Sequence, residues 1–128
     1  LELIEACLPE PVAATIGRHF GSHFFVYGCH ATRLRPGSPS KRSMLWHCDS
    51  GPTRHLKMIV YLEDSRVSGG NTAFLDRATS DGFLEHGYTF GPVRKRRHDL
   101  SGLARHLGLR FEPQAWDMKA GQGLLDFG

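Results

Sequence analysis

The segment at residues 55–62, HLKMIVYL, constrains the fold more than any other part of the sequence. Alternate side chains of a β-strand point to opposite faces, and in this segment both faces are largely apolar. One face carries apolar side chains only, and the other carries Lys57, Ile59 and Tyr61. A strand that is apolar on both faces is typical of the interior of a sheet. The sequence therefore predicts a fold organised around a sheet with this strand at its centre.

Further short extended segments surround this strand, and turns rich in the chain's 15 glycines and 7 prolines separate them. We expect these strands at residues 24–34, 71–75, 115–118 and 123–127. Helices are expected in residues 1–8 and 12–18, and again after Asp99, whose side chain can cap a helix that Gly108 ends. Short strands with helices only at the start and late in the chain favour an antiparallel sandwich or jelly roll over an α/β sheet.

The length of 128 residues suits one hydrophobic core, so we expect a single domain over residues 1–128. Residues 1–22 are expected to be a helical lead-in and residues 23–128 the β-barrel core, with a helical insertion near residues 99–108. The sequence ends on LLDFG, which has the pattern of a strand still in progress. We therefore expect a barrel that is incomplete at the C-terminus.

Composition and charge narrow the classes of partner. Sixteen basic and 13 acidic side chains give a net charge of +3, too small to indicate a nucleic-acid partner. The one dense basic run, RKRRH at residues 94–98, can hold phosphate groups, but it lacks interleaved aromatic residues and a solvated loop is its default interpretation. No apolar run is long enough to span a bilayer and no signal-peptide pattern opens the chain, so no membrane partner and a cytoplasmic location are expected.

Residues 46–50, WHCDS, contain the pattern with the clearest chemical meaning. In an extended backbone residues i and i+2 point to the same side, so His47 and Asp49 can chelate one ion. With one more histidine, this pair completes the facial triad that leaves open positions on Fe(II). Taken alone, an H-x-D tripeptide also fits a surface loop in which Asp49 caps a turn.

The surrounding sequence resembles a known family. Residues 45–75 resemble the Fe(II)/2-oxoglutarate-dependent dioxygenases, particularly the phytanoyl-CoA hydroxylase-like group and, in GGNTAF at residues 69–74, the prolyl 4-hydroxylases. The shared features are the H-x-D pair, an apolar strand ending in an aromatic-Leu pair with an acidic residue, and a glycine turn. Residues 116–128, WDMKAGQGLLDFG, look like the late barrel strand that in this family precedes the second histidine and a 2-oxoglutarate-binding arginine.

This resemblance implies a mainly β fold, the double-stranded β-helix or cupin-like jelly roll, with flanking helices. It implies a non-haem dioxygenase that uses Fe(II), 2-oxoglutarate and O2 to hydroxylate an unactivated C–H bond of a small molecule, releasing succinate and CO2. His47 and Asp49 would be metal ligands. The third ligand and the arginine would lie beyond Gly128, and His86, His98 and His106 are the internal histidines that might substitute for that ligand.

Five further residues are candidates for the site. By resemblance, Tyr61 lines the 2-oxoglutarate pocket and Thr72 adds a hydroxyl, although Tyr61 also fits as a core aromatic and Thr72 as a turn residue. The candidates for substrate contact are Arg33, Trp46 and Ser50, chosen for their nearness to the metal pair or, for Arg33, its place on an expected strand. Arg33 can bind a carboxylate in a bidentate way, or can be an exposed arginine at a strand end.

Two other functions remain open from the sequence. One is a noncatalytic cupin-like binding domain in which the H-x-D pair is structural. The other is a metal-dependent cupin enzyme that does not use 2-oxoglutarate. Neither the identity of the substrate nor the oligomeric state follows from the sequence.

Overall fold

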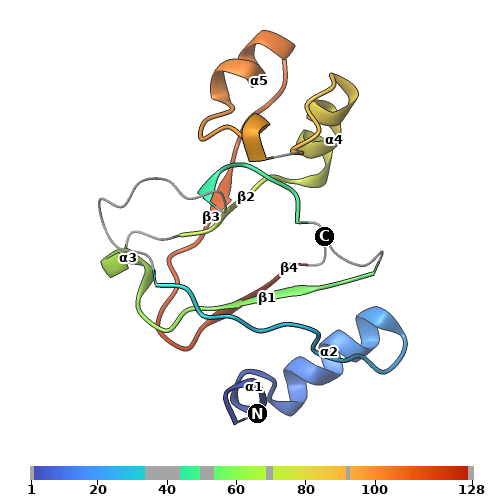
Figure 1. Cartoon of the computed structure of the whole chain (residues 1–128), viewed down its shortest axis with the longest axis vertical. Helices are drawn as coiled ribbons and strands as arrows, with labels where there is room; N and C mark the ends of the chain where they lie inside the picture. The colour runs from blue at the N-terminus through green and yellow to red at the C-terminus, as the bar shows by residue number, and fades with distance from the viewer. Residues whose placement is uncertain (1, 34–43, 50–53, 69–70, 92, 127–128) are drawn as a thin grey trace.

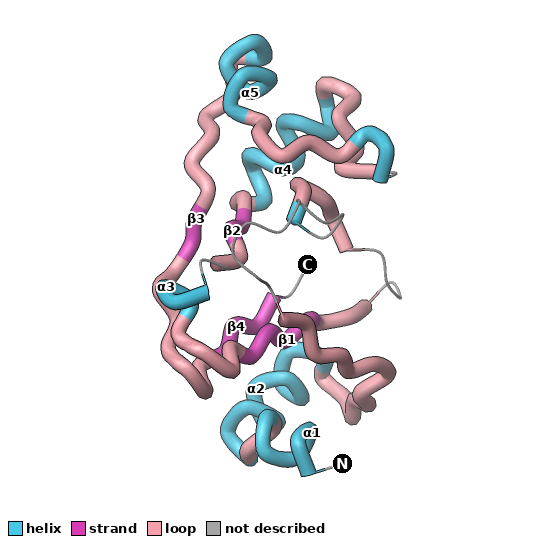
Figure 2. The backbone as a smooth tube through the Cα atoms, turned by 60° about the vertical axis from the view of Figure 1, so that its left-hand side comes forward, coloured by secondary structure: helices cyan, strands magenta, loops and turns pink. Residues whose placement is uncertain are grey.

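The computed structural model describes residues 2–33, 44–49, 54–68, 71–91 and 93–126. Helices lie at the two ends of the molecule and short strands lie between them, as the views in Figure 1 and Figure 2 agree. Helices α1 (Glu2–Cys7) and α2 (Glu10–Phe20) form one end, and α4 (Arg77–Glu85) and α5 (Ser101–Leu107) form the other. Two shorter elements are α3 (Ser65–Ser68) and η2 (Val93–Lys95), the second of which lies between α4 and α5 in the chain.

The strands described form two small antiparallel sheets. In the first sheet, β1 (Lys57–Val60) pairs with β4 (Gly123–Asp126), with Lys57 opposite Asp126 and Val60 opposite Gly123. The pairing continues past β1, because the Tyr61 amide donates to the Gln122 carbonyl at 2.9 Å. In the second sheet, β2 (Ala73–Phe74) pairs with β3 (Gln114–Ala115). Strands β1, β2 and β4 lie within the segments where the sequence predicts extended structure, whereas β3 shares only Ala115 with the strand expected at residues 115–118. The jelly roll as a whole stays a prediction.

The prediction of a strand over residues 24–34 is wrong for residues 24–33, which have no regular secondary structure. Phe25 is 80% exposed and Tyr27 is 61% exposed. Aromatic and β-branched residues favour a strand only where a neighbouring strand and a buried face receive them. The turn expected at residues 36–40 lies outside the described residues.

The helical predictions at both ends of the chain are confirmed. Helix α2 begins directly after Pro9, and Pro11 is tolerated in its first turn because the amides there have no partner within the helix. Helix α5 ends at Gly108, which adopts a left-handed φ of 69° as a glycine readily does. The prediction that Asp99 caps this helix is wrong, because the N-cap residue is Leu100 and makes no side-chain cap; the Asp99 carboxylate nevertheless accepts a hydrogen bond from the Ser101 amide at 2.8 Å.

Helix α4 falls in a stretch that the sequence interpretation left as a loop. Its first turn is capped by Asp76, whose carboxylate accepts a hydrogen bond from the Thr79 amide at 2.7 Å. Phe83 lies on the inner face of this helix and is fully buried. Among the described helices, none has the length and apolar character needed to cross a membrane.

The hydrophobic core of the molecule lies between α4 and α5. We call it the aromatic cluster: its buried members are Phe83, Phe90, Leu100 and Ala104. The ring of Phe83 meets those of Tyr88, Phe90 and Phe111 edge to face, with centroids 5.8 to 6.3 Å apart. Trp46 also packs against this cluster, so the segment that carries His47 is attached to the core.

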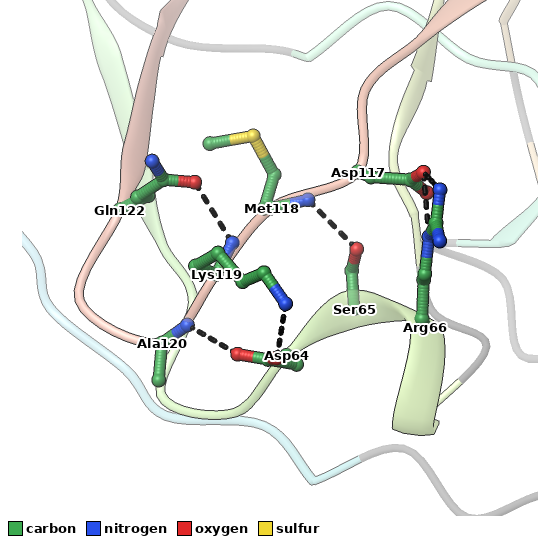
Figure 3. Close-up of polar contacts among 8 residues, drawn as sticks. All are labelled: Asp64, Ser65, Arg66, Asp117, Met118, Lys119, Ala120 and Gln122. Atoms are coloured by element: carbon green, nitrogen blue, oxygen red, sulfur yellow. Dashed lines mark hydrogen bonds and ion pairs between the residues drawn. The ribbon is translucent and has the colours of Figure 1, made fainter.

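A group of polar contacts joins the start of α3 to the turn before β4, and we call it the α3 clasp (Figure 3). Ser65 is fully buried; its amide donates to the Met118 carbonyl, and its hydroxyl accepts from the Met118 amide at 2.9 Å. The Asp64 carboxylate accepts from the Ala120 amide and from the Lys119 ammonium. The clasp fixes the turn that leads into β4, and so fixes the β1–β4 pairing.

Candidate metal centre

His47 and Asp49 lie in the short described segment 44–49, which contacts the aromatic cluster through Trp46 and β1 through the ion pair of Asp49 with Lys57. Their side chains converge: His47 Nε2 lies 3.1 Å from Asp49 Oδ1. Two atoms that bind one ion at about 2.1 Å and at right angles are themselves about 3.0 Å apart. The spacing of this imidazole and carboxylate therefore suits two neighbouring ligands of one metal ion.

The other ring nitrogen of His47 determines what its Nε2 can do. Nδ1 lies 2.6 Å from the Leu45 carbonyl oxygen. A carbonyl oxygen carries no hydrogen, so this contact requires a proton on Nδ1, and in the neutral ring Nε2 then carries a lone pair. That lone pair faces a carboxylate oxygen, so a cation must stand between the two atoms, either a second ring proton or a metal ion. The Leu45 carbonyl is the kind of partner that orients metal-binding histidines.

Lys57, which was not among the residues singled out from the sequence, completes this group. Its ammonium lies 2.5 Å from Asp49 Oδ2, the carboxylate oxygen that does not face His47. Burial raises the pKa of Asp49, but the hydrogen bond and charge of Lys57, together with His47, outweigh it and the pKa is lowered. Asp49 is therefore held as a carboxylate with one oxygen occupied and the other directed at His47. A lysine on an otherwise apolar strand was the signal in the sequence.

Cys48, between the two candidate ligands, does not join them. Partial burial raises the pKa of its thiol, and the negative charges of Asp49 and Asp126 raise it further. A protonated thiol is a poor metal ligand and a poor nucleophile. Asp126 belongs to the end of β4 and lies opposite Lys57 in the first sheet.

Tyr61 and Thr72, the candidates for 2-oxoglutarate binding, contact each other. The Tyr61 hydroxyl donates to Thr72 Oγ1 at 3.2 Å and accepts from the Thr72 amide at 3.1 Å. This arrangement leaves the Thr72 hydroxyl hydrogen for another acceptor. Tyr61 continues the face of β1 that begins at Lys57, because the two are four residues apart along an extended strand. One face of this extended segment therefore contacts both predicted pairs: Lys57 contacts Asp49, and Tyr61 contacts Thr72.

The structure does not show the candidates for substrate contact assembled at one place. Trp46 stands edge to face with Phe111, with ring centroids 5.7 Å apart, and packs against the aromatic cluster. Arg33 is an exposed residue of the irregular segment that ends at residue 33. Ser50 lies outside the described residues.

The internal histidines considered as a third ligand are not assembled with His47. The His86 ring lies against the carbonyl of Gly82 at 2.8 Å, at the end of α4. His98 follows the basic run and His106 lies on α5, and both are exposed. Within the described ranges, no group of three or more histidine, cysteine, aspartate or glutamate side chains is placed to hold a metal ion.

Comparisons of the chain with family models, with curated proteins and with solved structures gave no match.

Proposed function

We propose that the protein is a non-haem Fe(II)- and 2-oxoglutarate-dependent dioxygenase that hydroxylates a C–H bond of a small molecule. The observation that carries this proposal is the distance of 3.1 Å between His47 Nε2 and Asp49 Oδ1. Each of the two side chains also makes a second polar contact through its other nitrogen or oxygen. Leu45 orients the imidazole and Lys57 orients the carboxylate. Hydrogen-bonded partners of this kind position metal ligands in enzymes.

In this proposal, residues near one end of β1 bind the metal and residues near the other end bind the cosubstrate. His47 and Asp49 would hold the metal, which when bound supplies the oxygen chemistry coupled to oxidation of 2-oxoglutarate to succinate and CO2. At the other end, the Thr72 hydroxyl would donate to a carboxylate of the cosubstrate, and Tyr61 would fix the direction of that hydroxyl. Lys57 would keep Asp49 charged and bound through a single oxygen.

The third ligand belongs to the same proposal. The resemblance implies a histidine soon after residue 127, and the register of the first sheet supports that position. Asp126 lies opposite Lys57, whose ammonium contacts Asp49. The end of β4 therefore lies opposite the residue of β1 that contacts Asp49.

Succinate formation tests the function. The purified protein, incubated with Fe(II), 2-oxoglutarate and O2, is expected to release succinate, and the rate should fall by at least about 100-fold in His47→Ala because a ligand is lost. The matched control is His86→Ala, which removes an exposed histidine of α4 and should keep the wild-type rate. Equal rates in wild type and His47→Ala would contradict the proposal.

A noncatalytic binding domain is the second candidate, and one observation favours it. The ion pairs of Asp49 with Lys57 and His47 form a network that needs no metal if the imidazole carries two protons. Failure of Fe(II) to bind at His47 and Asp49 would support this candidate. Binding of Fe(II) without succinate formation would instead support a metal-dependent cupin enzyme that does not use 2-oxoglutarate.

A further inference from the structure

The basic segment, residues 94–98, carries the densest run of positive charge in the sequence. Several cations elsewhere among the described residues form ion pairs with carboxylates: these are Lys57, Arg66, Arg77, Arg110 and Lys119. In the basic segment, Arg94, Lys95 and Arg97 are exposed, and no described carboxylate forms an ion pair with them. With Arg96, the segment holds four positive charges in four consecutive residues, and an anion bound there would reduce their mutual repulsion.

This segment is held in place at several points. The residues that flank it, Phe90 and Leu100, are both buried in the aromatic cluster. Within it, Arg96 is half-buried and its Nε donates to the Gly91 carbonyl at 3.3 Å. The Arg97 carbonyl accepts a hydrogen bond from the Trp46 amide at 2.9 Å. A loop that is anchored in this way loses little conformational entropy when it binds a ligand.

The last of these contacts gives the segment its place relative to the metal pair. Trp46 directly precedes His47 in the chain, so the Arg97 backbone lies beside the backbone of the candidate metal centre. Helix η2, which carries Arg94 and Lys95, ends two residues before Arg97 in the chain. Trp46 is fixed in turn by its packing on Phe111. The backbone of the basic segment is therefore attached to the chain one residue before the candidate metal centre.

We propose that the basic segment binds a phosphate group of the substrate, so that the oxidised molecule is a small phosphate or pyrophosphate ester. The oxygens of a phosphate or pyrophosphate group share its negative charge and can accept hydrogen bonds from several cationic side chains at once. Guanidinium groups suit this geometry. A nucleic acid is less favoured, because the segment has no aromatic side chains on which bases could stack and the net charge is only +3. As a statement about the substrate, this rests on the proposed oxygenase function; as a statement about phosphate binding, it does not.

Binding of pyrophosphate to the metal-free protein, measured by calorimetry at about 150 mM salt, a physiological ionic strength, tests the phosphate site. The test variant carries Arg94→Gln, Lys95→Gln and Arg97→Gln. We expect its Kd to rise roughly 10- to 100-fold, which corresponds to the loss of three partly exposed charged contacts. No change in Kd would overturn the proposal. His47→Ala should bind pyrophosphate like the wild type, so a failed metal centre and a failed phosphate site give different results.

A control variant separates specific binding from the effect of net charge. It carries Arg18→Gln, Arg77→Gln and Arg110→Gln, which remove the same number of exposed positive charges elsewhere. Its Kd for pyrophosphate should stay within about twofold of wild type, because long-range effects are screened at this salt concentration. An equal loss of affinity in both variants would overturn the proposal. Tighter binding of a 20-nucleotide RNA than of pyrophosphate, lost in the test variant, would also overturn it in favour of a nucleic-acid surface.

Matched pairs of small molecules connect this site to catalysis. Succinate formation is measured with sugars and nucleosides and with their phosphate esters. We expect stimulation by a phosphorylated member of a pair, and loss of that stimulation in the test variant. Stimulation by unphosphorylated members alone would overturn the assignment of substrate class.

Discussion

The aromatic cluster and the first sheet are held together by different interactions. In the cluster, Phe83 and Leu100 are fully inaccessible and the rings meet edge to face. Around β1 and β4, side chains are half-buried and the contacts are polar, as in the α3 clasp and in the group formed by His47, Asp49 and Lys57. Apolar burial contributes most of the free energy of folding, whereas a partly hydrated polar group stays accessible to ligands.

This difference indicates a division of roles. The cluster supplies a rigid support, and the sheet presents the groups that can do chemistry. Trp46 joins the two, because its ring packs on the cluster while its chain neighbour His47 faces Asp49. Substitutions in the cluster should therefore change stability, whereas substitutions at the centre should change ligand binding.

The largest effect is expected from Phe83→Ala. The side chain is fully buried among three other rings, so its removal leaves a cavity and should lower the free energy of unfolding by about 3–5 kcal/mol. The neighbouring Leu84→Ala is the control, because Leu84 is 43% exposed and should cost less than about 1 kcal/mol. Urea denaturation measures both. Similar losses in the two variants would mean that the cluster is not the main source of stability.

Ser65→Ala should produce the next largest effect and tests whether the sheet depends on polar contacts. The buried Ser65 hydroxyl accepts from the Met118 amide, which would lose its partner, so we expect a loss of about 1–3 kcal/mol in the same denaturation experiment. Ser22→Ala at an exposed position should stay within about 0.5 kcal/mol of wild type. A loss no larger than that of Ser22→Ala would show that the clasp contributes little.

A smaller effect of opposite sign is expected in the cluster itself. Among the described residues, the Tyr88 hydroxyl is buried without a hydrogen-bond partner. Tyr88→Phe removes this unsatisfied group and keeps the ring contacts with Phe83 and Phe90, so stability should be unchanged or should rise by about 1 kcal/mol. A clear loss of stability on thermal unfolding would instead point to a partner for this hydroxyl.

The smallest effect concerns the pH dependence of the clasp. The hydrogen bond from Lys119, followed by that from the Ala120 amide, lowers the pKa of Asp64 below its value in the unfolded chain. The contribution of Asp64 is therefore present above the unfolded pKa and is lost as pH falls through the lower, folded pKa. The difference in Tm between wild type and Asp64→Asn should be largest near neutral pH and should shrink below the usual aspartate pKa of about 4. A difference that does not change with pH would contradict this role.

Much of the local structure follows from the sequence where a short-range rule applies. Gly108 ends α5 because the left-handed conformation suits glycine, and the alternation of side chains in β1 places Lys57 and Tyr61 on one face. The convergence of His47 and Asp49 also agrees with the i, i+2 rule for an extended backbone.

The remaining features depend on contacts between distant segments. The exposed residues 24–33 have strand-forming side chains but no regular structure, because propensity does not supply a partner strand. The contact of Lys57 with Asp49 and that of Arg97 with Trp46 join residues 8 and 51 positions apart. Spacing along the chain does not reveal such contacts, so Lys57 and the position of the basic segment emerge only from the structure.

The most direct test of the central claim is a Co(II) titration of the isotope-labelled protein followed by NMR. We predict that paramagnetic broadening appears first at His47, Asp49 and Lys57 and is lost in Asp49→Ala, while His86→Ala behaves like the wild type. Nitrogen shifts of the His47 ring should then report a single ring proton, on Nδ1, when metal is bound. Broadening centred elsewhere, with His47 carrying two ring protons in its pair with Asp49 at every Co(II) concentration, would contradict the account.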